Sequence, residues 1–293
     1  MLESAIFVKR RSALFKRKGI DGIIAQAVLV LCLAIVLLLT MLPLLVTLVM
    51  SVKTPQDITQ YPMWTLPKSG WMFSNYANAL NVLIKPMLNT VIIDLVSTVV
   101  TLFISCFVAY LFEKKKFPGR KFLFLVFIAP MLVPSVVVLS PTYIVVAQWL
   151  HLKDNWLGLI LPYIAGNQIA SVFLLRTFMS QQPDSLYEAA KLDGASTFKV
   201  FMHICLPLSV PIMMVQGINI FAAIYNDYLW PQLLFQADLT KGVLMPYLRS
   251  VVTSFTQGVQ YAMYLVAGIP LIITTIISIK FFVNGDFASG MKL

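Results

Sequence analysis

Two acidic residues of this 293-residue chain stand inside long apolar stretches, where a carboxylate is hardest to accommodate. Asp94 lies in TVIIDLVST and Asp227 lies in AAIYNDYLWPQ. A carboxylate at the centre of a membrane costs at least ~3 kcal/mol, so such residues usually face a wet cavity or a partner. For Asp94 we expect a role in helix packing or in an ion pair.

The neighbours of Asp227 combine hydrogen-bonding groups with aromatic rings. This mixture suits a polar, ring-shaped solute such as a sugar, which can hydrogen-bond and stack. The alternative is that Asp227 lies near the outer end of its helix, where water is close and the carboxylate has a structural role. The candidate path for a solute comprises Asn89, Asn219, Tyr225, Asn226, Asp227, Tyr228 and Trp230.

Motifs for catalysis or for a metal do not accompany these residues. The sequence has no GxxxxGK[ST] phosphate loop, no HExxH and no GxSxG. His151 and His203 have no carboxylate or nucleophile partner in the sequence, and the three cysteines have no paired spacing. We therefore expect a non-catalytic chain without a metal site, so a nucleotide that drives its work must be bound by another chain.

The elements that must position these residues are membrane helices. The chain is 59% hydrophobic and only 12% charged, whereas an average globular chain is about a quarter charged. A helix needs roughly 20 apolar residues to cross the hydrocarbon core. The sequence thus predicts an all-α, polytopic membrane protein with six transmembrane helices, at about 23–50, 86–112, 122–147, 157–179, 207–232 and 261–283. Kinks are expected in the third span at Pro130, Pro134 and Pro141.

The basic residues predict the orientation of these spans. With the N-terminus inside, most of the 22 Lys and Arg residues fall in cytoplasmic segments. Both termini are therefore expected in the cytoplasm, and the net charge of +10 is explained by membrane topology and lipid headgroups, without nucleic acid. The predicted organisation is a basic cytoplasmic segment 1–22 and a transmembrane domain 23–293, with external loops 51–85 and 233–260, a cytoplasmic hairpin 184–207 and a cytoplasmic tail 284–293.

The predicted hairpin, DSLYEAAKLDGASTFKVFMHICLP, reads like part of a soluble protein. Ser185 and Glu188 fit a capping box that starts a helix. Gly194 can take a positive φ angle, which would end that helix and turn the chain. A second helix is expected to end at Leu206 and Pro207, where the fifth span opens.

The second helix of the hairpin carries one apolar stripe. A single hairpin cannot bury such a stripe by itself, so we expect it to dock on another surface. An amphipathic connector lying on the lipid headgroups is the alternative. The stripe comprises Phe198, Phe201, Met202 and Cys205.

The spacing of the hairpin residues is specific. The pattern E-A-A-x3-G-x9-I-x-L-P resembles the signature loop of the permease subunits of binding-protein-dependent ABC importers, and FLLRTFMSQQPDSL, LDGAS and PLSVP around it are similar to the MalG-like sugar-transport branch. YNDYLWPQLL and VNGDFASGMKL extend the resemblance, which runs from about residue 86 to the end. The residues that meet the pattern are Glu188, Ala189, Ala190, Gly194, Ile204, Leu206 and Pro207.

This resemblance implies an ABC importer permease fold of the MetI-like type, in the bacterial inner membrane. It implies that the hairpin docks in a cleft of an ATPase subunit through these residues together with Asp193. The implied partners are a second homologous permease, two ATPase subunits that bind ATP and magnesium, and a periplasmic or extracellular solute-binding protein. This chain itself would hold no cofactor.

The implied solute is an oligosaccharide or polysaccharide fragment, either an acidic one of the alginate type or a neutral one of the maltose type. No residue of the sequence separates these two. The competing hypothesis is a self-contained six-span channel or a secondary carrier driven by an ion gradient through Asp94 or Asp227.

Overall fold

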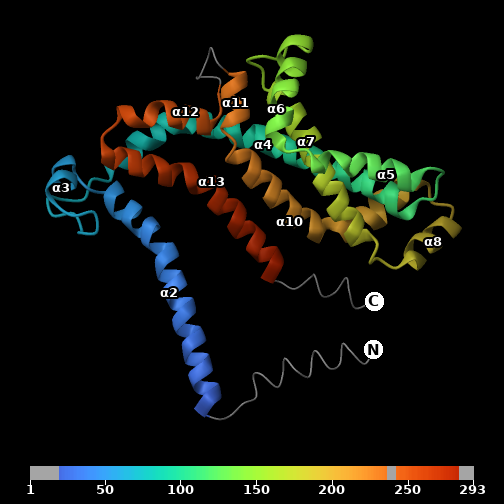
Figure 1. Cartoon of the computed structure of the whole chain (residues 1–293), viewed down its shortest axis with the longest axis horizontal. Coiled ribbons are helices and arrows are strands. Elements are labelled where there is room, and N and C mark those ends of the chain that lie inside the picture. The colour runs from blue at the N-terminus through green and yellow to red at the C-terminus, as the bar shows by residue number, and fades with distance from the viewer. Residues whose placement is uncertain (1–19, 236–241, 284–293) are drawn as a thin grey trace. The chain divides into compact units, whose positions relative to one another are not determined.

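The computed structural model describes residues 20–235 and 242–283, and all regular elements in these two ranges are helices (Figure 1). One sharply bent pair of helices, Arg120–Leu132 and Ser135–Trp149, forms a candidate membrane span if its halves are counted together, in addition to the unbroken helices named below. The predicted all-α polytopic membrane protein is therefore confirmed. The five unbroken helices that are long and apolar enough to cross a membrane contain Gln26–Ser51, Ser74–Lys114, Leu157–Met179, Thr197–Tyr225 and Gln257–Ser278.

The described chain divides into two compact units, and each has its own elements. The first unit runs up to Asn75 and includes Gln257–Ala262. It contains α2 (Ile20–Ser51), α3 (Pro55–Gln60) and the first turns of α13 (Gln257–Val283). The second unit contains most of α4 (Ser74–Lys114), then α5 (Arg120–Ile128), η1 (Ala129–Leu132), α6 (Ser135–Tyr143), η2 (Ile144–Trp149), α7 (Leu157–Met179), α8 (Asp184–Leu192), α9 (Thr197–Val200), η3 (Phe201–Cys205), α10 (Leu206–Tyr225), α11 (Leu229–Leu234), α12 (Leu244–Val251), η4 (Val252–Ser254) and the rest of α13.

Helix α2 is apolar on all sides. Its spanning part has a mean hydropathy of 3.1, and its most apolar stretch buries none of its residues inside the protein. A helix without a polar face is suited to contact with lipid. The expected basic segment before it lies, up to residue 19, outside the described residues, as does the expected tail 284–293.

The segment after α2 is folded through two buried charged side chains. Lys53 donates to the Pro62 carbonyl at 2.9 Å and to the Thr65 hydroxyl at 3.1 Å. Asp57 accepts from the Ser69 hydroxyl at 2.8 Å and from the Lys68 amide at 2.9 Å. Burial acts to raise the pKa of Asp57, but these hydrogen bonds and the charge of Lys53 outweigh it and hold the pKa below its ordinary value.

The second span begins earlier than the sequence suggested. Helix α4 starts at Ser74, so residues 74–85 are helical and the predicted external loop 51–85 is too long at its end. The helix has 41 residues. Apolar side chains continue on its buried side before the predicted start at residue 86, with Ala79 and Leu83 fully buried, so tertiary packing supports the additional turns.

The third span is broken in the middle. Its two halves, Arg120–Leu132 and Ser135–Trp149, meet at an angle of 96°. Val133 takes an extended conformation (φ −91°, ψ 124°), as expected for a residue before proline, and Pro134 cannot donate to the preceding turn. The kink expected at Pro134 is thus confirmed, and it is sharp enough to divide the span expected at 122–147 into two helices.

Two apolar cores hold the second unit together. One joins the end of α4, the end of α7 and the hairpin that follows α7. The other joins the middle of α4, η2, the start of α7 and α11, around Leu159, Trp230 and Leu234. Each core therefore joins helices that are far apart in the sequence.

Candidate coupling hairpin and translocation path

The first arm of the hairpin is α8, and it begins one residue before the predicted cap. Pro183 occupies the N-cap position without a side-chain hydrogen bond, so the capping box of Ser185 and Glu188 is wrong. Asp184 lies in the first turn, and its carboxylate instead accepts a hydrogen bond from the ammonium of Lys114 at 2.7 Å. The hydrogen bond and charge of Lys114 hold the pKa of Asp184 below its ordinary value.

The turn of the hairpin forms as predicted. Gly194 has a φ angle of +76°, in the left-handed region that glycine enters most readily. Ser196 then caps the second arm, because its hydroxyl accepts a hydrogen bond from the Lys199 amide at 3.3 Å. The sequence signal for this cap is a serine two residues after Gly194, since serine is a preferred N-cap residue.

The second arm does not end at Leu206 and Pro207, contrary to expectation. The helix runs without interruption from Thr197 to Tyr225, and both Cys205 and Leu206 have right-handed helical angles. The turn before the proline is a π-helix, Phe201–Cys205, whose wider winding accommodates the ring and the missing N–H. The arm and membrane helix α10 are therefore one continuous rod.

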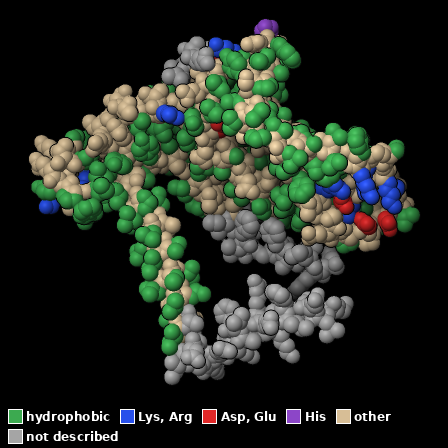
Figure 2. Space-filling model, viewed as in Figure 1, with side chains coloured by type: hydrophobic (Ala, Val, Ile, Leu, Met, Phe, Trp, Pro, Cys, Tyr) green, Lys and Arg blue, Asp and Glu red, His purple; other side chains and the backbone are tan. Residues whose placement is uncertain are grey.

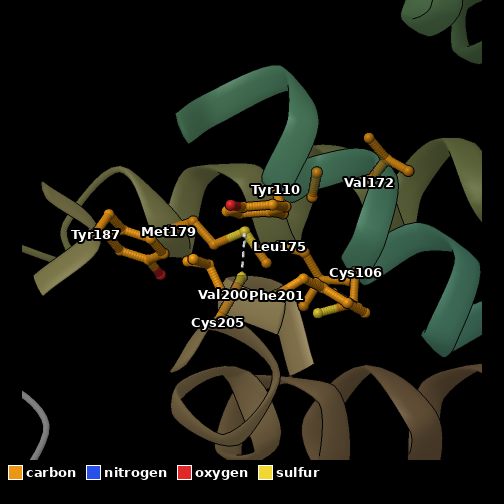
Figure 3. Close-up of a cluster of buried hydrophobic side chains, with 10 residues drawn as sticks. Cys106, Tyr110, Val172, Leu175, Met179, Tyr187, Val200, Phe201 and Cys205 are labelled. Atoms are coloured by element: carbon orange, nitrogen blue, oxygen red, sulfur yellow. Dashed lines mark hydrogen bonds between the residues drawn. The ribbon is translucent and has the colours of Figure 1, made fainter. Parts of the chain in front are cut away.

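The apolar stripe of the second arm is covered by this chain in part: Phe201 and Cys205 are buried, Met202 is partly buried and Phe198 is exposed. Phe201 and Cys205 are fully buried and pack with Tyr110 of α4 and with Leu175 and Met179 of α7 (Figure 3). The ring of Phe107 on α4 meets Phe201 edge-on, with 4.9 Å between the centroids. The surface that covers the stripe is thus formed by the ends of α4 and α7.

A different part of the hairpin faces outward. Leu192 is 89% exposed and Phe198 is 56% exposed, and they flank the Gly194 turn. Glu188, Ala189, Asp193 and Gly194 are also exposed, whereas Ala190 is partly buried. The residues at the far end divide differently: Ile204 and Leu206 pack partly against the apolar cluster, while Pro207 is exposed.

A cavity of about 320 Å³ lies between α7 and the end of α10. Asp227 forms part of its wall, and Oδ2 of this carboxylate accepts a hydrogen bond from the Tyr163 hydroxyl at 2.9 Å. Its Oδ1 accepts from the amides of Leu229 at 3.0 Å and Trp230 at 3.4 Å, at the start of α11. The lining residues are Tyr163, Asn167, Ala223, Ile224, Asn226 and Asp227.

The helices that carry the hairpin and the cavity match a known family. Residues 101–285 fit the model of the binding-protein-dependent transport system inner membrane component. The chain belongs to this family. Because its members are permease components of ABC transporters, the expectation of a non-catalytic membrane subunit is confirmed.

Curated relatives of the permease span most of its length. The probable ABC transporter permease YurM of Bacillus subtilis is 30% identical over 254 residues, which cover 85% of this chain and 83% of the relative. The diacetylchitobiose uptake system permease NgcG of Streptomyces coelicolor is 30% identical over 256 residues, covering 85% and 82%. The sn-glycerol-3-phosphate transport system permease UgpE of Pectobacterium atrosepticum is 29% identical, covering 92% and 96%.

Two solved structures share the fold of the permease. A bacterial ABC transporter that imports the acidic polysaccharide alginate matches with a TM-score of 0.79 at 22% identity, over 90% of this chain and 98% of that chain. An alginate ABC transporter in complex with an alginate pentasaccharide-bound periplasmic protein matches with a TM-score of 0.59 at 16% identity, over 89% and 95%. The expected MetI-like permease fold is therefore confirmed.

Three other residues of the predicted path make hydrogen bonds between segments of the permease. Asn89 donates to the Gly242 carbonyl at 3.2 Å. The Tyr225 hydroxyl donates to the Ala267 carbonyl at 2.8 Å, and the Trp230 indole donates to the Gly158 carbonyl at 3.2 Å. Tyr225 and Trp230 are buried, and the cavity lining includes none of the three donors.

The last two predicted path residues also lie outside the cavity lining. Asn219 is exposed on α10. Tyr228 is 43% exposed, and the guanidinium of Arg249 lies 5.0 Å from the centre of its ring. Of the seven predicted residues, the structure thus brings Asn226 and Asp227 together at the cavity.

Four lining residues are absent from the predicted path, namely Tyr163, Asn167, Ala223 and Ile224, and Tyr163 is the one that pairs with Asp227. It stands four residues before Asn167, one turn earlier on the same face of α7, and the Asn167 amide donates to the Tyr163 carbonyl at 2.8 Å. A tyrosine in a predicted span next to an amide was the available signal. Its pairing with Asp227 depends on the packing of α7 against α10.

Asp94 is fully buried on α4 and does not line the cavity. Its Oδ1 accepts a hydrogen bond from the Thr98 hydroxyl at 3.1 Å, one turn along the same helix. Its Oδ2 has no hydrogen-bond partner within residues 20–235 and 242–283. Ser97, Thr101 and Ser105 continue this buried polar face of α4.

Proposed function

We propose that this permease is one transmembrane subunit of an ATP-driven importer for oligosaccharides or polysaccharide fragments in the bacterial inner membrane. It pairs with a second, homologous permease and forms half of an alternating-access pathway. Two ATPase subunits bind ATP and magnesium on the cytoplasmic side, and a solute-binding protein delivers the solute from outside. The family membership supports this proposal, as do the relatives that belong to a diacetylchitobiose uptake system and to an sn-glycerol-3-phosphate transport system.

The geometry of the hairpin is the observation that carries the coupling role. Its outward tip carries two largely exposed apolar side chains, Leu192 and Phe198, on an element too polar to lie within the membrane. An exposed apolar tip of this kind is suited to burial in a partner's cleft. Because the second arm is continuous with α10, a displacement of the tip moves a membrane helix directly.

We propose that the residues that line the cavity at Asp227 form part of the wall of the pathway. Amide, phenol and carboxylate groups converge there from Asn167, Tyr163 and Asp227. Such groups exchange hydrogen bonds with sugar hydroxyls as readily as with water. The other five predicted residues then either hold this wall in place or line the pathway beyond the cavity. They are Asn89, Asn219, Tyr225, Tyr228 and Trp230.

Co-purification tests the importer against the competing channel or secondary carrier. The permease is expressed with its partner subunits, and the complex is reconstituted with the binding protein. We expect ATPase subunits to co-purify stoichiometrically and saccharides to stimulate ATP hydrolysis. Uptake that persists without any ATPase subunit and follows an ion gradient would overturn the proposal.

Replacement of the hairpin glycine tests the coupling role more directly. At Gly194 an added Cβ has open space, so Gly194→Val acts through backbone strain, at about 1–3 kcal/mol for a left-handed conformation. Gly119 has the same φ angle of +76° and the same open space in the loop between α4 and α5, so Gly119→Val is a matched control. We expect Gly194→Val to abolish uptake with normal membrane insertion, while the control retains uptake.

A further inference from the structure

Lys114, the last residue of α4, makes three contacts with the start of the hairpin. Its ammonium donates to the Gln182 carbonyl at 2.8 Å and to the Asp184 carboxylate at 2.7 Å. It also lies 4.8 Å from the centre of the Tyr187 ring. The side chain of Lys114 is only 5% exposed, which is unusual for lysine, and the space-filling view shows basic and acidic side chains gathered around α5 and α8 (Figure 2).

An aromatic contact supports the same junction. Tyr187 on α8 is buried and stacks on Tyr110 of α4, with 6.1 Å between the ring centroids. The Tyr187 hydroxyl donates to the side chain of Gln182, next to the carbonyl that Lys114 binds. The contacts of Lys114, Tyr110 and Tyr187 therefore fix the orientation of α8 on the end of α4.

Helix α4 is not adjacent to the hairpin in the sequence, whereas α7 precedes the hairpin and α10 follows it. A displacement of the hairpin reaches α4 only through packing and polar contacts. Apolar packing alone is non-directional and allows helices to slide, whereas the paired ammonium of Lys114 holds one register. Lys114 thus supplies charged, directional hydrogen bonds from α4 to Gln182 and Asp184.

A second contact of α4 lies within the first half of the helix, about four turns after Ser74. Asn89 donates to the Gly242 carbonyl, and the Thr90 hydroxyl accepts a hydrogen bond from the Leu244 amide at 2.7 Å, at the start of α12. At ~1.5 Å per residue, about 37 Å of helix separates Asn89 from Lys114. Helix α4 therefore contacts the hairpin at its last residue and the segment from Gly242 at Asn89 and Thr90.

We propose that Lys114 is a positioning residue that transmits the movement of the hairpin to α4, and through Thr90 to the segment beginning at Gly242. The solute pathway is then moved by two helices, α10 through its covalent continuity with the hairpin and α4 through Lys114. This inference rests on the proposed coupling role of the hairpin. It adds a second route by which ATP-driven movement reaches the membrane domain.

The test measures solute uptake per ATP hydrolysed in the reconstituted complex. Lys114→Met keeps the apolar stem and removes the charge. We expect this variant to co-purify with the ATPase subunits as the unsubstituted chain does, and to lower uptake per ATP roughly fivefold or more, a coupling effect of ordinary size. Lys114→Arg should restore most of the ratio, because a guanidinium can again pair with Asp184.

Lys116→Met is the matched control, because Lys116 is an exposed lysine two residues after Lys114 and its removal changes the net charge equally. Equal values of uptake per ATP for Lys114→Met and Lys116→Met would overturn the proposal. A Lys114→Met variant that no longer binds the ATPase subunits would also overturn it. If Lys114→Met fails to insert, Asp184→Asn serves instead, since the Asp184 side chain is 77% exposed. We expect Asp184→Asn to lower the ratio by a smaller factor, and an unchanged ratio overturns the proposal.

Thr90→Val tests the far end of the route. This substitution removes the acceptor for the Leu244 amide at nearly constant volume. We expect uptake per ATP to fall as it does for Lys114→Met, and an unchanged ratio would overturn the route beyond α4. If the unsubstituted chain binds no ATPase subunit, the proposed importer function is wrong. This result differs from one in which the unsubstituted chain binds the ATPase and only the variants have lower uptake per ATP.

Discussion

The hydroxyl of Tyr163 on α7 donates a hydrogen bond to Asp227, 2.9 Å away and 64 residues later in the chain. The Asp227 carboxylate also accepts two amides at the start of α11. The same side chain thus connects α7, the end of α10 and α11 beside the cavity. Its structural role and its place on the cavity wall are compatible, because the three hydrogen bonds leave acceptor capacity on a carboxylate.

Tyr163→Phe removes the donor and leaves the ring. A hydrogen bond to a charged group contributes about 1.5–3 kcal/mol, so the variant should unfold at a lower temperature than the unsubstituted permease in detergent. Tyr264→Phe is the control, since Tyr264 is 50% exposed on α13. Equal melting temperatures for both variants would contradict the importance of the contact with Asp227.

Asp227→Ala and Asp227→Asn separate the structural role from the pathway role. Asn retains an acceptor for the Leu229 and Trp230 amides, whereas Ala removes it at a cost of about 0.5–2 kcal/mol, as for other helix caps. If the carboxylate also contacts solute, both variants should raise the half-saturating solute concentration for uptake. Unchanged uptake kinetics in both variants would restrict Asp227 to a structural role.

Two glycines on α7, Gly158 and Gly166, differ in the space around them, so their alanine variants should differ in thermal stability. A Cβ at Gly158 would lie 2.5 Å from the Leu152 carbonyl oxygen and 2.8 Å from Leu234, so Gly158→Ala should destabilise the permease by about 1–3 kcal/mol. A Cβ at Gly166 meets nothing within 4 Å, so Gly166→Ala should be neutral or stabilising by up to about 1 kcal/mol. Thermal unfolding in detergent measures both, and the reverse order would contradict the packing of α7.

The ion pair between Lys114 and Asp184 predicts a pH dependence. Because Lys114 lowers the pKa of Asp184 in the folded state, the pair stabilises the fold above the ordinary carboxyl pKa of 3.8 and this contribution is lost as the pH falls through the lowered value. The difference in melting temperature between the unsubstituted chain and Asp184→Asn should therefore be present at pH 7 and shrink on acidification below about pH 4. A difference that is the same at both pH values would contradict the pair. In a chain that already carries Lys114→Met, the further change Asp184→Asn should cause no such difference.

Local features of the chain were predictable because they depend on short-range backbone preferences. Gly194 takes a positive φ because a residue without Cβ enters that region without steric cost, and Pro134 breaks the third span because it lacks an N–H. The length and apolarity of the spans follow from the thickness of the hydrocarbon core. The spacing from Glu188 to Pro207 likewise belongs to one continuous segment, so it could be compared with a family pattern.

Pro207 shows where local reasoning failed. A proline predicts a helix boundary, but the π turn before it keeps the helix intact, and the burial of Phe201 and Cys205 in the apolar cluster stabilises that turn. The capping box at Ser185 failed for a related reason, since Asp184 is held by Lys114 from another helix. In both cases a tertiary contact outweighed a local preference.

The partners of the functional side chains came only from the packing of distant helices. Tyr163 and Asp227 are 64 residues apart, and Lys114 and Asp184 are 70 residues apart. Apolar periodicity shows that a helix has a buried side, but it does not show which helix covers that side, because the hydrophobic effect is non-directional. The amino-acid order was therefore sufficient for the presence of the membrane helices, the glycine turn of the hairpin and the family, whereas the exact helix bounds, the cavity wall and the junction of α4 with the hairpin arise from three-dimensional packing.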